Sequence, residues 1–487
     1  MIKAKHLIDK IASRKILEQA ADDALDALDD KEVWYAKKFI AKREERIDRI
    51  QNMIILGIYP HKKYKPVKHL ENGKMRDIFP LDFDPWSILF HAVKIVIEPI
   101  INRILIFDTS AGIEDKGQVF AALRTKRAIR RYKKLTHFSQ SDLKKFYVSI
   151  PHDVILDSLR YCIDDELFID LIICTMLDYY DTKIEDILQA EHERKMEYCK
   201  WASDVLYPRR GKRGIIIGSC ISQLIGNLVL CHIDRIMTEK HKVKGYHRHC
   251  DDTIMLGDSI YRTNYLLNVL DGECNKLGLC IKASSYVSVL KDEEKDIDGR
   301  ALDYVGYVFS RKNMRIRKRN KVKFSRAMSR VKSRKRKYKL VSSFYGIAKW
   351  GKGTNLLNTI LINNNMSFRD FGIKTEEILR DRNGKRIFDI PETKPSEVIR
   401  MNNGEIVVYD FEEGIRIKDK DNKCCVVFRY MNDGESVRRK FIHSSSRIVD
   451  KLMMAREKEK NGVKVFPQPT RLTEVRLCNG RYTYDIE

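Results

Sequence analysis

The spacing of apolar residues divides the chain into helical and strand-like segments. Apolar residues recur at helical intervals over residues 5–56, which predicts two or three helices. Residues 62–80 predict a β-hairpin, because two short strand-like segments flank a turn at Glu71-Asn72-Gly73. A long helical region is predicted from Trp86 to about Tyr132. The first quarter of the chain is therefore expected to be mainly helical, with one hairpin.

The middle of the chain mixes short strands with helices. In order, its predicted elements are a strand ending near Asp142, helices to about residue 207, a helix at 221–240, a strand–turn–strand centred on 250–252, a helix at 261–277 and a hairpin near 296–318. This order predicts an α+β sheet backed by helices.

The last third is predicted to be helical at 341–375, with a linker at 381–395. Turn residues then separate five predicted strands, at 405–418, 423–430, 437–443, 463–467 and 473–485, with one helix near 445–460. This order is similar to that of an OB-like barrel, a fold that often binds single strands. Candidate ligand-binding residues on its second and third strands are Arg429, Tyr430, Arg438, Arg439, Lys440 and Phe441.

Composition narrows the class of protein. The chain has 487 residues, of which 43% are hydrophobic and 33% charged, which is enough apolar content for folded cores. Its net charge of +25 favours a polyanionic partner such as nucleic acid. No segment resembles a signal peptide, and the longest apolar stretch, 86–107, is interrupted by charges and a proline, so no membrane association is expected. The eleven cysteines form no Cys-x-x-Cys pair, which indicates reduced thiols and a cytoplasmic location.

Much of the positive charge lies in one segment. Residues 311–340 contain sixteen Lys or Arg residues and no acidic residue. Such a run would repel itself unless an anion neutralised it, so we expect it to bind nucleic acid. The candidate contacts are Arg334, Lys335, Arg336 and Lys337.

Carboxylates at strand ends carry the candidate chemistry. Asp142 ends one predicted strand, and Asp251 and Asp252 occupy a predicted hairpin tip 109 residues later. Adjacent like charges repel, and a divalent cation such as Mg²⁺ is the usual counter-charge. Two such ions can activate a 3′-hydroxyl and stabilise a leaving pyrophosphate. Between these sites, Gly218 permits a close backbone approach, and Ser222 or Gln223 can cap the helix that follows.

Together these segments resemble motifs A, B and C of reverse transcriptases. The segment Gly218-Ser219-Cys220-Ile221-Ser222-Gln223, which follows an aliphatic residue, resembles the variant of bacterial diversity-generating and defence-associated enzymes, which are retron- and group II intron-like. The resemblance covers about residues 60–360, including 72–78 in the fingers, 279–282 as motif D and 303–307 as the primer grip. It implies a right-hand polymerase with four parts: N-terminal helices (1–60), fingers and palm (61–310), a basic helical thumb (311–380) and a small β-domain (396–487).

The resemblance also implies roles for individual residues. Asp142, Asp251 and Asp252 would be the catalytic metal ligands, and Lys282 would protonate the leaving pyrophosphate. Tyr147 would reject a ribose 2′-hydroxyl. The other implied substrate contacts are Lys74 and Arg76 on the triphosphate, and Gly218, Ser222 and Gln223 in the motif B loop.

The implied activity is RNA-directed DNA synthesis from deoxynucleoside triphosphates with two Mg²⁺ ions, for which Mn²⁺ can substitute. Relatives use a dedicated structured non-coding RNA as template, and a role in bacterial phage defence is favoured because the chain has an extra C-terminal domain. A diversity-generating enzyme, an RNA polymerase and a non-catalytic or template-independent RNA-binding relative stay open, as does homo-oligomerisation. Departures from the family pattern include His249, where Tyr or Phe is usual, Ile113 in place of Arg, and Ile217 in place of Gln.

Overall fold

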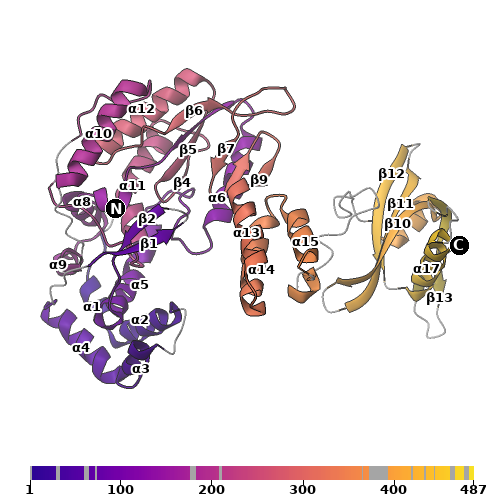
Figure 1. The fold of residues 1–487 in the computed structure, drawn as a ribbon, viewed down its shortest axis with the longest axis horizontal. Coiled ribbons are helices and arrows are strands. Elements are labelled where there is room, and N and C mark those ends of the chain that lie inside the picture. The colour runs from indigo at the N-terminus through magenta and orange to yellow at the C-terminus, as the bar shows by residue number, and fades with distance from the viewer. Residues whose placement is uncertain are drawn as a thin grey trace. The chain divides into compact units, whose positions relative to one another are not determined.

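The computed structural model describes residues 3–28, 33–59, 65–71, 74–175, 182–207, 211–364, 366–371, 393–417, 420–432, 435–443, 445–460, 465, 467–476 and 482–487. The chain divides into two compact units, Met1–Arg317 and Lys318–Glu487 (Figure 1). None of the described helices is long and apolar enough to cross a bilayer.

The first unit begins with four helices, where two or three were predicted. They are α1 (Leu7–Ile11), α2 (Arg14–Asp26), α3 (Trp34–Ile40) and α4 (Arg43–Leu56). The predicted hairpin is formed by β1 (Val67–Glu71) and β2 (Lys74–Ile78), and a short turn η1 (Phe83–Ser87) follows. The predicted helical region 86–132 is two helices, α5 (Ile88–Asn102) and α6 (Gln118–Arg131). The chain leaves the helical conformation between them, where Gly112 and Gly117 have positive φ angles of 64° and 129°.

A four-stranded antiparallel sheet forms the centre of the first unit. Its strands are β3 (His137–Ser141), β4 (His247–His249), β5 (Asp252–Gly257) and β6 (Tyr286–Val289), in the spatial order β4-β5-β3-β6. Two helices, α11 (Ser222–Arg235) and α12 (Ile260–Lys276), contribute many buried leucines and isoleucines to the core of this unit. The predicted α+β class is confirmed, and this sheet lies in the region where the sequence predicts the palm.

The remaining helices of this unit lie between motif A and motif B. They are α7 (Phe146–Ser149), α8 (His152–Cys162), α9 (Glu166–Thr175) and α10 (Thr182–Tyr198), and the short η2 (Ile236–Lys240) extends α11. A second small sheet contains β7 (Leu302–Tyr304), β8 (Tyr307–Phe309) and β9 (Met314–Ile316). Because β9 pairs with β8, the first unit ends at Arg317 rather than at residue 310.

The second unit begins with the basic helices α13 (Lys318–Arg330) and α14 (Arg334–Ala348), followed by α15 (Thr354–Ile362) and η3 (Phe368–Phe371). Phe324 and Phe344 stack at a ring separation of 4.0 Å and join α13 to α14. The helix predicted over 341–375 is not continuous. α14 ends at Ala348, and α15 begins at Thr354, directly after Gly353. Most of the predicted linker, 381–392, lies outside the described residues.

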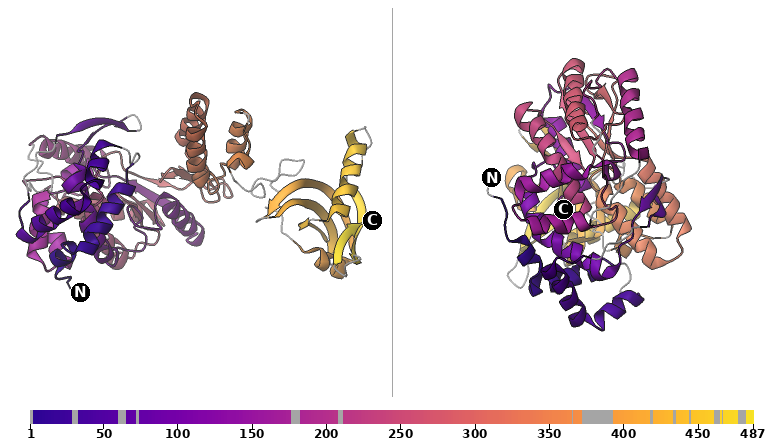
Figure 2. Two further views of the ribbon diagram at one scale, coloured as in Figure 1. Left: turned by 90° about the horizontal axis from the view of Figure 1, so that it is seen from below. Right: turned by 90° about the vertical axis from the view of Figure 1, so that its left-hand side faces the viewer.

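The C-terminal β-domain has the predicted succession of three strands, a helix and two strands, but the bounds of the last two strands differ from the predicted 463–467 and 473–485, and a helix that was not predicted precedes them all. After α16 (Pro395–Asn402) come β10 (Glu405–Ile417), β11 (Lys420–Asn432), β12 (Glu435–His443), α17 (Ser446–Lys460), β13 (Gln468–Arg476) and β14 (Tyr482–Ile486). They form one antiparallel sheet in the order β12-β11-β10-β13-β14. The long strands curve (Figure 2), and β10 contains register shifts that favour such bending. In the described part of this sheet no ladder joins β12 to β14, so the barrel is not closed by strand pairing.

Candidate active site

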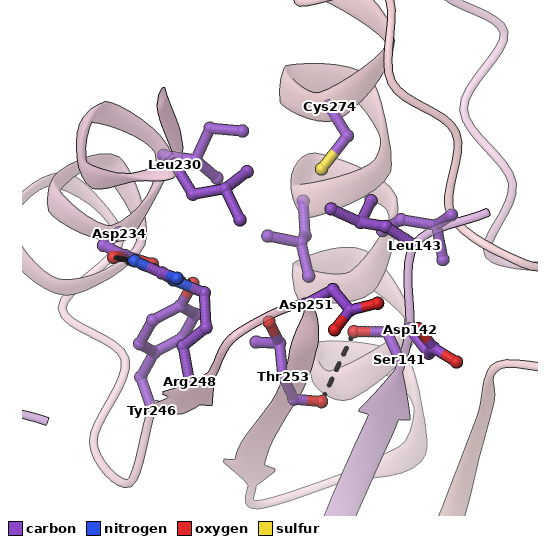
Figure 3. Close-up of a pocket in the computed structure, with 13 residues that line it drawn as sticks. Ser141, Asp142, Leu143, Leu230, Asp234, Tyr246, Arg248, Asp251, Thr253 and Cys274 are labelled. Atoms are coloured by element: carbon purple, nitrogen blue, oxygen red, sulfur yellow. Dashed lines mark hydrogen bonds and ion pairs between the residues drawn. The ribbon is translucent and has the colours of Figure 1, made fainter. Parts of the chain in front are cut away.

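Two neighbouring strands bring three aspartates together. β3 pairs with β5 so that Ser141 lies opposite Thr253. Asp142 follows directly after β3, Asp252 begins β5, and Asp251 precedes it in the turn. Residues 109 positions apart in sequence therefore share one end of the sheet, and the carboxylates of Asp142 and Asp251 lie close together (Figure 3). The structure confirms the predicted convergence of these strands.

The turn that carries Asp251 is tight. Cys250, at its tip, has a positive φ angle of 60°, a conformation that non-glycine residues adopt uncommonly. The Arg248 guanidinium donates a hydrogen bond of 2.9 Å to the Cys250 carbonyl. This contact stabilises the backbone conformation of the turn.

Arg248 belongs to a buried polar network that the sequence interpretation missed. Its guanidinium pairs with Asp234 of α11 at 2.6 Å, and both side chains are at most 1% exposed. Asp234 also accepts hydrogen bonds from Tyr246 at 2.7 Å and Thr109 at 3.3 Å, and Arg248 donates to Asn227 at 2.9 Å. Figure 3 shows Arg248 and Tyr246 beside Asp234. No local pattern marks this network, because its members come from three segments that are far apart in the sequence.

The environment of the aspartates raises their pKa values. Burial, Asp142 and Asp252 raise the pKa of Asp251 to about 7. Burial and Asp142 likewise raise the pKa of Asp252 to about 6, although Lys282 and Arg317 act in the opposite direction. A cavity of about 10 Å³ behind Asp142 and Asp251, lined also by Leu230 and Cys274, is large enough for about one water molecule. The site therefore concentrates negative charge that lacks full neutralisation.

Lys282 is the nearest cation to Asp142. Its ammonium group forms an ion pair with the Asp142 carboxylate, and its backbone N–H donates to the Asp142 carbonyl at 2.9 Å. Glu191 of α10 ties the same two loops together. It accepts hydrogen bonds from the Lys144 ammonium and from the Ala283 N–H, both at 2.7 Å. Sequence reasoning identified Lys282 but missed Glu191, which has no motif of its own.

The donor set fits a hard divalent cation. Carboxylate oxygens are the ligands that Mg²⁺ prefers, and a cation would offset the repulsion among the carboxylates that, with burial, raises the pKa values of Asp251 and Asp252. Within the described ranges, however, no three His, Cys, Asp or Glu side chains are already gathered around a metal position. Asp142 is paired with Lys282 instead, so metal binding would require this ion pair to rearrange.

Tyr147, the predicted sugar gate, lies beside the aspartates. Its hydroxyl group is 2.7 Å from the Cys250 thiol. Its backbone carbonyl accepts a hydrogen bond of 2.9 Å from the Ile215 N–H. A Cβ atom at Gly226 of α11 would come within 3.4 Å of the Tyr147 ring and 2.9 Å of Phe146. Cys250 therefore contacts the hydroxyl group, Gly226 leaves room for the ring, and sequence reasoning assigned neither residue this role.

The motif B loop approaches the fingers hairpin. Gly218 has a φ angle of 108°, and a Cβ atom there would lie 3.4 Å from Ile78 at the end of β2. The Ile217 carbonyl accepts a hydrogen bond of 3.3 Å from the Phe79 N–H. The side chains of Lys74 and Arg76 lie outside the described residues, so their predicted contact with triphosphate stays a prediction.

The predicted helix cap at Ser222 or Gln223 is wrong. Ser222 is the first residue of α11, and its buried hydroxyl donates to the Ile216 carbonyl instead of accepting from a helical N–H. Gln223 is exposed, and a Cβ atom at Gly112 would lie 2.7 Å from its amide oxygen. Of the two residues, only Gln223 is therefore accessible to a ligand.

The four predicted nucleic-acid contacts in the thumb lie at the start of α14. Arg334, Lys335 and Arg336 are exposed, whereas Lys337 donates to Asn364 at 3.2 Å. Cations are unfavourable at a helix N-terminus, which itself attracts anions. This placement is consistent with binding of phosphate.

Some of the predicted ligand-binding residues in the β-domain are buried and others are exposed. Tyr430 and Phe441 are 7% and 0% exposed and pack in the core, so these two candidates are not available to a ligand. Lys440 is also largely buried, whereas Arg429 is exposed and Arg439 is half-buried. The Arg438 side chain lies outside the described residues. Strand alternation gave no indication of which face meets α17, because both faces carry apolar residues.

No family model and no curated protein match the chain. Among solved structures it is similar to apo telomerase from Candida tropicalis, with 12% identity, a TM-score of 0.36 and coverage of 63% of this chain and 57% of that one. It is also similar to the foamy viral protease–reverse transcriptase in complex with double-stranded DNA, with 12% identity, a TM-score of 0.31 and coverage of 86% and 60%. The chain thus spans less than two thirds of either protein. The function assigned to the site depends on its own geometry.

Proposed function

We propose that this protein is an RNA-directed DNA polymerase. The observation that carries the proposal is the meeting of Asp142, Asp251 and Asp252 at one end of the β3–β5 pair, where burial and mutual repulsion raise two of their pKa values. Bound there, Mg²⁺ would supply activation of a primer 3′-hydroxyl and neutralisation of the triphosphate.

The residues of the chain have distinct parts in the proposed reaction. Asp142, Asp251 and Asp252 would hold the cations, and Lys282, released from its ion pair with Asp142 by that binding, would supply a proton to the leaving pyrophosphate. The Tyr147 ring, held by Cys250, excludes a ribose 2′-hydroxyl and so selects deoxynucleotides. The Gly218 loop, which lacks a side chain at that point, allows close approach of a nucleotide or template.

We propose further that the template is a dedicated structured non-coding RNA and that the product DNA serves bacterial phage defence. The exposed cations at the start of α14 support a polyanionic partner. The resemblance of the motif B segment to bacterial defence-associated and diversity-generating enzymes supports the biological setting.

Sequencing of the nucleic acids that copurify with the protein from its host tests this proposal. We expect one abundant RNA together with DNA complementary to it. The Asp251→Ala, Asp252→Ala double variant should retain the RNA and lose the DNA. Plaque counts on cells that carry either form test the defence role, with protection expected only from the wild type. DNA complementary to the RNA in the double variant would contradict the polymerase assignment, and equal plaque counts would contradict the defence role.

A further inference from the structure

Helix α6 and the turn after it form a second basic segment without acidic residues. Residues 116–141 contain eight Lys or Arg residues and no Asp or Glu. The helix buries Ala121, Ala122, Ala128 and Ile129 against the first unit. The exposed cations lie on its other side and in the turn that follows. They are Arg127, Arg130, Arg131, Lys133 and Lys134, which we call the α6 patch.

The fold uses a different cation of α6 for its own packing. Arg124 pairs with Asp108 at 2.6 Å, and Asp108 also lies 3.4 Å from His247 of β4. This pair attaches α6 to the edge of the palm sheet. Across the described part of the chain, no member of the α6 patch forms an ion pair, and only Arg131 contacts an aromatic ring, that of Tyr132, at 5.6 Å. The α6 patch is therefore not needed to attach α6 to the rest of the first unit.

Capping of the helix C-terminus does not account for the patch either. Arg311 donates hydrogen bonds to the Ile129 carbonyl at 2.9 Å and to the Leu135 carbonyl at 2.7 Å. These bonds satisfy carbonyl groups that a nearby Lys or Arg would otherwise serve. Favourable interaction with the helix dipole extends only over the last turn and applies to Arg130 and Arg131 alone.

Placing these cations together costs stability unless an anion is present. Arg127 lies three and four residues before Arg130 and Arg131, and like charges at these spacings destabilise a helix. Arg311, which contacts the end of α6, is also the first cation of the basic run 311–340. The acid-free segment 116–141 and the basic run 311–340 therefore meet at this contact within the first unit.

We propose that the α6 patch binds the phosphate backbone of nucleic acid, as an additional surface outside the aspartate site. Duplex nucleic acid carries about one negative charge per 1.7 Å of helix axis, so a patch of this size faces several phosphates. The proposal rests on the proposed function for the identity of the ligand, because a polymerase must hold its template and product. It adds a binding surface that the polymerase motifs do not include.

Salt-dependent binding of a fluorescent RNA–DNA duplex tests the patch. The variant Arg127→Gln, Arg130→Gln, Arg131→Gln, Lys134→Gln removes four cations. Its matched control, Lys10→Gln, Lys15→Gln, Lys38→Gln, Arg49→Gln, removes four exposed cations from the N-terminal helices. We expect the slope of log affinity against log salt to fall by about two to three in the patch variant. At about 0.15 M salt its affinity should fall at least roughly tenfold, while the control stays near the wild type.

Equal slopes for the patch variant and the control would overturn the proposal. A milder variant, Arg130→Gln with Lys134→Gln, should lose about half as much slope, and it decides the question if the fourfold variant does not fold. DNA synthesis on an RNA template by the same preparations separates this proposal from the proposed function. A wild type that binds through the patch but makes no DNA would contradict only the proposed function. Synthesis by a wild type whose affinity does not depend on the patch would contradict only the surface.

Discussion

The aspartate site and the start of the thumb helix α14 both concentrate like charge, but they hold it in opposite ways. At the aspartate site, Asp251 and Asp252 lie in a turn held by a buried ion pair, and their pKa values are raised. At the start of α14, Arg334, Lys335 and Arg336 are exposed to water. The comparison shows that the palm depends on long-range contacts to keep its charges together. The thumb cations depend on the local helix, so they can be changed with little effect on the fold.

The largest effect should come from breaking the support beneath the turn. Arg248→Met leaves Asp234 buried without its partner and should destabilise the first unit by about 3–5 kcal/mol. The thermal unfolding midpoint measures this loss. The double variant Arg248→Met, Asp234→Leu should recover a large part of it, because no unpaired charge remains. If Arg248→Met unfolds at the wild-type temperature, the buried pair does not hold the site.

Removal of one carboxylate from the aspartate site should stabilise the metal-free protein instead of destabilising it. The pKa of Asp251 is raised in the folded state, so that state binds more protons than the unfolded chain between about pH 4 and 7. Stability should therefore fall as pH rises through that range. Asp251→Asn should stabilise the metal-free protein at pH 8 by an amount on the order of 2 kcal/mol and have no such effect below about pH 4.

Thermal unfolding with and without Mg²⁺ measures this gain. Added Mg²⁺ should stabilise the wild type and reduce the advantage of Asp251→Asn. Asp186→Asn, which changes an exposed carboxylate, is the control and should have little effect. A wild type that is more stable than Asp251→Asn at pH 8 without metal would show that the carboxylates do not repel one another.

A smaller effect should follow from loss of the thiol that holds Tyr147. Cys250→Ala removes one hydrogen bond from the Tyr147 hydroxyl, worth about 1 kcal/mol. Discrimination against ribonucleotides should therefore fall about fivefold. Cys250→Ser keeps a hydroxyl donor and should retain most of the discrimination. The ratio of kcat/KM for deoxynucleotide and ribonucleotide measures the change. Equal ratios for alanine and wild type would remove Cys250 from sugar selection.

The smallest effect on stability is expected in the thumb. Changing Arg334, Lys335 and Arg336 together to Gln should alter the free energy of unfolding by no more than about 0.5 kcal/mol, because exposed residues contribute little. The salt slope of duplex binding should nevertheless fall by about two. Chemical denaturation and a binding titration on one preparation give both values. A large loss of stability without a change in slope would reverse the contrast with the palm.

Local sequence patterns could predict most helices and strands, and the aspartates at the ends of the strands. Asp142 and the pair Asp251-Asp252 interrupt strand-like segments, so their positions at strand ends followed from the sequence. The break between α5 and α6 was missed because apolar residues continue through it, although Gly112 and Gly117 are a local signal for it.

The contacts that position the site could not be predicted in the same way. Arg248 meets Asp234, and Cys250 meets Tyr147, only after the sheet has formed, and neither pair has a characteristic spacing. Ser222 has the residue type of a helix cap, but its hydroxyl bonds to the Ile216 carbonyl, because the preceding loop folds back over the helix start. Long-range packing decides these side-chain positions, and a single sequence does not record it.

Extension of a DNA primer on an RNA template tests the central claim most directly. The purified wild type, supplied with deoxynucleoside triphosphates and Mg²⁺, should extend the primer and prefer deoxynucleotides to ribonucleotides. Asp142→Asn and Asp251→Asn should each reduce extension by at least about a thousandfold while the protein stays folded, because each removes a carboxylate from the proposed metal site. Undiminished extension by either variant, or a wild type that extends only with ribonucleotides, would contradict the account.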